Sequence, residues 1–73
     1  MDYSIDKSIV IDFPVPGYLH ETMKKADACY ETDPDSFDYL HLLDALDQDV
    51  KEAHLSGKIS YSQAKRIFYR YGI

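Results

Sequence analysis

Apolar side chains recur every three or four residues in three separate stretches, and this spacing constrains the fold more than any other feature. Such spacing places side chains on one face of an α-helix. The three stretches carry Leu19, Met23, Ala26 and Tyr30, then Tyr39, Leu43, Leu46, Val50 and Ala53, then Tyr61, Ala64, Phe68 and Tyr71. Because 73 residues are enough for only one domain, three apolar stripes with short connections predict a small, mostly α, three-helix bundle over residues 17–73.

Capping residues predict where these helices begin and end. Asp33 followed by Pro34 is typical of an N-cap and first helical position. Ser60 and Gln63 have the spacing of a capping box, and Gly57 is a stop signal for the helix before it. The three helices are therefore expected at residues 18–31, 34–55 and 60–71.

Residues 1–16 differ from the rest of the chain and are expected to form an extended N-terminal arm or a short edge β-strand. The alternation typical of a strand covers residues 8–13 and continues just beyond, with apolar side chains at Ile9, Ile11, Phe13 and Val15. Pro14 and Pro16 lack backbone N–H groups, which excludes a central strand. A single strand needs a partner, so residues 8–13 could pair in a hairpin, with another protein, or with a second copy in a homodimer.

Charge is distributed unevenly along the chain. All thirteen Asp and Glu residues lie before residue 53, whereas the last 21 residues contain four basic residues and no acidic one. On the second predicted helix, five carboxylates surround the sides and back of the apolar stripe: Asp38, Asp44, Asp47, Asp49 and Glu52. They could form a solvated face, with Asp47 paired to Lys51, or dock as a phosphate-like row on a basic protein surface. Phe37, Leu40 and Leu55 lie outside the stripe and favour a second interface.

The third predicted helix presents the opposite charge. Lys65, Arg66, Tyr69 and Arg70 point away from its apolar stripe. Basic residues interleaved with an aromatic side chain can grip phosphates and stack on bases. The alternative is that these residues pair with the acidic second helix, and the net charge of −5 favours this alternative because it repels nucleic acid.

Catalytic and metal-binding patterns are absent from the sequence. His20, His41 and His54 share no i,i+4 spacing, and Cys29 is not close to any of them. No Gly-rich elbow, phosphate loop or dinucleotide fingerprint occurs. We therefore expect no enzymatic activity, no catalytic residue, no metal and no cofactor.

These observations predict a non-catalytic protein-binding module. The favoured interpretation is a small acidic inhibitor or regulator that occupies a basic, nucleic-acid-binding surface of another protein. The alternatives are a homodimeric adaptor paired through residues 8–13, and a nucleic-acid binder acting through the third helix. A single cysteine, no secretory leader pattern and no long apolar run predict a cytoplasmic protein with no membrane span. The predicted partner-binding residues are Phe37, Asp38, Leu40, Asp44, Asp47, Asp49, Glu52 and Tyr69.

Overall fold

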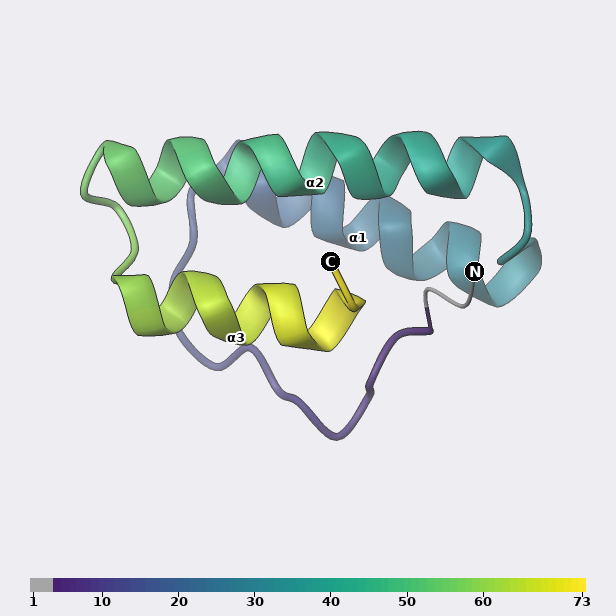
Figure 1. The fold of residues 1–73 in the computed structure, drawn as a ribbon, viewed down its shortest axis with the longest axis horizontal. Coiled ribbons are helices and arrows are strands. Elements are labelled where there is room, and N and C mark those ends of the chain that lie inside the picture. The colour runs from purple at the N-terminus through teal and green to yellow at the C-terminus, as the bar shows by residue number, and fades with distance from the viewer. Residues whose placement is uncertain (1–3) are drawn as a thin grey trace.

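A computed structural model describes residues 4–73 and contains three helices. They are α1 (Gly17–Thr32), α2 (Phe37–Leu55) and α3 (Tyr61–Tyr71) (Figure 1). The longest helix, α2, packs against both of the others, whereas α1 and α3 have no backbone contact with each other. The mostly helical, three-helix fold predicted from the sequence is confirmed, with α2 as its central element.

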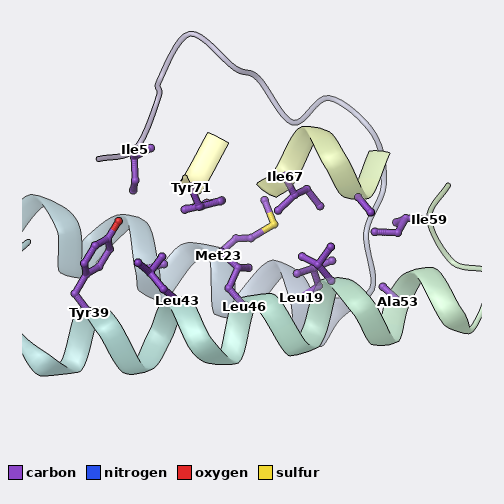
Figure 2. Packing of buried hydrophobic residues seen from close by; sticks show 13 residues of the cluster. Ile5, Leu19, Met23, Tyr39, Leu43, Leu46, Ala53, Ile59, Ile67 and Tyr71 are labelled. Atoms are coloured by element: carbon purple, nitrogen blue, oxygen red, sulfur yellow. The ribbon is translucent and has the colours of Figure 1, made fainter. Parts of the chain in front are cut away.

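The hydrophobic core lies on one face of α2. All five residues of the predicted α2 stripe are buried: Tyr39, Leu43, Leu46, Val50 and Ala53. Figure 2 shows side chains from α1 and α3 pointing toward this stripe, among them Leu19, Met23, Ile67 and Tyr71. Three of the six largest fully buried side chains among the described residues, Tyr39, Leu46 and Val50, come from α2, which is consistent with its central place.

The stripe predicted for α3 is partly wrong. Tyr61 is 67% exposed, and Phe68 is only partly buried, whereas Ile67 is fully buried. Ile59 lies just before the helix and is itself buried, so it takes the core position that the prediction gave to Tyr61. Tyr61 then becomes the first residue of α3 and points away from the core.

The predicted start of α2 is also wrong, because Ser36 and not Asp33 caps this helix. The Ser36 hydroxyl accepts a hydrogen bond from the backbone N–H of Tyr39 at 3.1 Å. Asp33 instead ends α1, where its backbone N–H donates to the carbonyl of Cys29 at 2.7 Å. Pro34 therefore lies in the turn between the two helices and not in the first turn of α2.

The remaining helix boundaries agree with the capping signals in the sequence. The Ser60 hydroxyl accepts from the Gln63 N–H, and the Gln63 side chain accepts from the Ser60 N–H, so the capping box at the start of α3 is present. Gly57 and Gly72 follow α2 and α3 with φ angles of 77° and 68°. In this left-handed region glycine avoids the steric cost that other residues incur.

Residues 4–16 form an extended arm, and the described residues contain no β-strand. Its alternation is preserved, since Ile9, Ile11, Phe13 and Val15 are partly buried, and the last three of them pack against the core cluster. Val10 and Asp12, between them, are exposed. At the start of the arm, Ile5 is buried in the core (Figure 2). The arm thus removes most of its apolar side chains from water by packing on the helices of its own chain.

Candidate partner-binding surfaces

The side of α2 opposite the core carries exposed apolar and acidic residues together. We call this surface the α2 outer face; it consists of Phe37, Asp38, Leu40, Asp44, Glu52 and Leu55. Phe37 and Leu55 are 80% and 81% exposed, the highest values among the large apolar residues described. Within residues 4–73, the carboxylates of Asp38, Asp44 and Glu52 have no hydrogen bond or ion pair, so they are free to meet an external partner.

Two of the five predicted α2 carboxylates are engaged inside the molecule. Asp47 pairs with Lys51 at 3.0 Å, as the solvated-face interpretation expected. Asp49 accepts a hydrogen bond of 2.6 Å from the hydroxyl of Thr22 on α1. The structure therefore brings three of the five acids onto the α2 outer face and uses Asp49 to join α2 to α1.

Two of the α3 bases hold the N-terminal arm. Arg66 donates through Nε to the carbonyl of Val10 at 2.7 Å, and Arg70 donates to the carbonyl of Ile9 at 2.8 Å. Arg70 also lies 3.6 Å from the carboxylate of Asp27 on α1. The expectation that these bases pair with the acidic second helix is wrong, because their partners in the described residues are carbonyls of the arm and, for Arg70, the carboxylate of Asp27 on α1.

A buried tyrosine closes the space between α1 and α3. The hydroxyl of Tyr71 donates to the Asp27 carboxylate at 2.8 Å, and burial raises the pKa of Tyr71 above its usual range. The Arg70 guanidinium lies 5.5 Å from the centre of the Tyr71 ring. Asp27 thus accepts a hydrogen bond from Tyr71 and forms an ion pair with Arg70, and these contacts link two helices that have no backbone contact.

The arm and α3 enclose an open hollow of about 440 Å³, which we call the arm–α3 groove. It is lined by Ile9, Phe13, Ser62, Gln63, Lys65, Arg66 and Tyr69, and none of these residues is acidic. Lys65 lies 5.4 Å from the ring centre of Tyr61 and 5.8 Å from that of Tyr69. No carboxylate of residues 4–73 pairs with Lys65, so this groove combines apolar side chains with an uncompensated cation.

Helical spacing alone marks Lys65, Arg66 and Tyr69 as outward-facing residues, but the groove that they line is not evident in the sequence. Its other wall comes from Ile9 and Phe13, more than fifty residues away in the chain. The helical spacing of α3 indicates an outward basic face, yet no local pattern indicates that the arm crosses it. Tyr69, predicted as a partner-binding residue beside the α2 acids, lies in this groove and not on the α2 outer face.

No group of three or more His, Cys, Asp or Glu side chains in residues 4–73 is placed to hold a metal ion. Cys29 is half-buried, with its sulfur 3.6 Å from the Ser36 hydroxyl. No helix in the described part of the chain has the length and apolarity needed to cross a membrane. Comparisons with protein-family models, curated proteins and solved structures find no match.

Proposed function

We propose that this protein is a non-catalytic binding module, a small acidic inhibitor or regulator whose α2 outer face occupies a basic surface of a partner protein. The observation that carries this proposal is the placement of free carboxylates between two highly exposed apolar side chains. Phe37 and Leu55 lie eighteen residues apart, which is about 27 Å along the helix. Asp44 and Glu52 lie between them, with no partner among residues 4–73.

The two kinds of residue have different roles in such an interface. Exposed apolar groups contribute affinity when a partner removes them from water. Carboxylates contribute mainly to the rate of association, because they steer a basic surface toward the face. A row of carboxylates on a rigid helix is also a substitute for phosphates, so a nucleic-acid-binding site is the kind of basic surface that we propose. The single Cys29, half-buried and without a disulfide, is compatible with a cytoplasmic location for this activity.

Two alternatives have weaker support. For nucleic-acid binding through α3, Arg66 and Arg70 would first have to leave the arm carbonyls that they bind. For a homodimer paired through residues 8–13, a second strand would have to compete with those arginines for the carbonyls of Ile9 and Val10. Both alternatives therefore disturb contacts that hold the arm, whereas the α2 outer face is already exposed.

The test is the association rate with the partner, first isolated from the host extract on the immobilised protein and identified by mass spectrometry. We compare two charge-neutralised double variants, Asp44→Asn with Glu52→Gln on the face and Asp12→Asn with Glu21→Gln elsewhere. Both remove two charges, so a steering role predicts a rate several-fold lower for the face variant, with a difference that shrinks as salt is added. Equal rates for the two variants would mean that the face acids only keep the protein soluble.

A further inference from the structure

We propose that the arm–α3 groove is a second docking site and that its occupant is the α2 outer face of another copy of this chain. The protein would then associate with itself head to tail. This inference rests on the proposed function only in treating the α2 outer face as a binding surface. It adds a second site, its occupant and a means of regulation.

The groove has the chemistry of a site for an acidic partner that also carries apolar side chains. Ile9 and Phe13 supply an apolar wall from the arm, and Tyr69 supplies an exposed aromatic ring from α3. Lys65 and Arg66 supply positive charge. The polar residues that line the groove are otherwise uncharged, so nothing within it opposes a carboxylate.

The α2 outer face has the complementary composition. Its free carboxylates at Asp44 and Glu52 lie on the same helix as the exposed apolar side chains of Phe37 and Leu55. A long nucleic acid offers charge without the aliphatic and phenyl groups that the arm wall would bury. A helix that bears both kinds of side chain matches the groove better.

The two surfaces lie on opposite sides of the molecule, so one copy cannot fill its own groove. Figure 1 shows α2 along one side and α3 with the arm along the other. The core stripe of α2 faces α3, which leaves the outer face directed away from it. A contact between two different surfaces is heterologous, and it extends into chains or closes into rings. Each copy in such an assembly would have its α2 outer face covered, which would make it unavailable to the basic partner.

Sedimentation of the full chain tests this proposal over concentrations from about 10 µM to about 1 mM, the range in which weak interfaces dissociate. A face variant carries Phe37→Ser and Leu55→Ser, and a groove variant carries Lys65→Glu. These side chains are exposed, so the fold should survive, and circular dichroism checks that it does. The matched control is Lys58→Glu, which reverses an exposed lysine outside the groove.

We expect the wild type and the control to increase in mass with concentration and each single-surface variant to remain at 8.5 kDa. A mixture of the two variants should give a species of twice that mass that grows no further, since it contains one intact face and one intact groove. A wild type that stays monomeric throughout would overturn the proposal, and it would leave the partner-rate test unaffected.

Two other outcomes would also overturn it. If both variants still dimerise alone, the contact is symmetric, as pairing through residues 8–13 would be. If a labelled single-stranded oligonucleotide binds the wild type but not the Lys65→Glu variant, the groove is a site for nucleic acid.

Discussion

Replacing Arg70 by Gln should destabilise the protein far more than replacing Arg66 by Gln, although both arginines bind a carbonyl of the arm. The side chain of Arg70 is only 17% exposed, and it contacts both the arm and Asp27 on α1. Arg66 is exposed and makes one hydrogen bond, to Val10. The comparison therefore separates a half-buried anchor from a solvent-exposed one on the same helix.

The expected magnitudes follow from these contacts. A hydrogen bond from a charged donor in a partly buried place contributes about 1.5–3 kcal/mol. If the arm then detaches, Ile5 leaves the core, and burial of such a side chain contributes about 1.5–3 kcal/mol. If the arm detaches only in part, Arg70→Gln should lower the free energy of unfolding by about 2–4 kcal/mol. The exposed Arg66 should cost at most about 1 kcal/mol. Since a domain of this size has a total stability of roughly 4–11 kcal/mol, the Arg70 effect is large.

Urea unfolding followed by circular dichroism measures both losses, and hydrogen exchange locates them. The backbone N–H of Asp6 donates to the carbonyl of Arg70 at 2.7 Å, and that of Ile9 donates to Asp6 at 3.1 Å. These two amides should exchange faster in Arg70→Gln than in Arg66→Gln, while the α2 amides change only with global stability. Equal losses below about 0.5 kcal/mol in both variants, or unprotected arm amides in the wild type, would refute the anchoring role of Arg70.

Three further predictions follow from the core and the caps. Leu46→Ala should cost about 3–5 kcal/mol in urea unfolding, because this fully buried side chain leaves a cavity at the centre of α2; a loss below about 1 kcal/mol would contradict its core position. Ser60→Ala should cost about 1 kcal/mol by removing the α3 N-cap, whereas Ser62→Ala, two residues further along the chain, should have little effect because Ser62 does not cap the helix. Burial raises the pKa of Tyr39 to about 12, so the folded state keeps a proton that the unfolded state loses near pH 10. The free energy of unfolding should therefore fall as the pH rises from 10 to 12, and it should fall less steeply in Tyr39→Phe. Identical slopes in the two proteins would show that Tyr39 does not contribute to this loss of stability.

Most of the helical fold can be predicted from the sequence because its signals are local. The five apolar positions of α2 lie within fifteen residues, and the capping box at Ser60 spans four. The errors occurred where two local signals compete. Asp33 and Ser36 are both good N-cap residues, and Asp33 is instead the residue that ends α1. Likewise Tyr61 has the spacing of the α3 apolar stripe, but the structure buries Ile59 at this end of the core and leaves Tyr61 exposed.

The surfaces could be predicted only in part, because the arm is placed by contacts between distant residues. Arg66 and Arg70 reach backbone carbonyls that lie 56 and 61 residues earlier in the chain. Every residue has a backbone carbonyl, so residue types do not indicate which carbonyl an arginine will bind. From the sequence, an arginine that binds a carbonyl therefore cannot be distinguished from one that is free to bind phosphate. For this reason the basic face of α3 was visible in the sequence, whereas its engagement with the arm and the resulting groove were not.

The arm makes the two proposed surfaces separable by experiment. It supplies Ile9 and Phe13 to the groove, and Arg70 keeps it in place, whereas α2 lies along the opposite side of the molecule (Figure 1). Weakening the arm with Arg70→Gln should therefore abolish head-to-tail association under conditions in which the bundle stays folded. The association rate with a basic partner should be retained or increased, because fewer copies have their α2 outer face covered. If the same change instead slows partner association, the partner contacts the arm, and the α2 outer face alone does not form the interface.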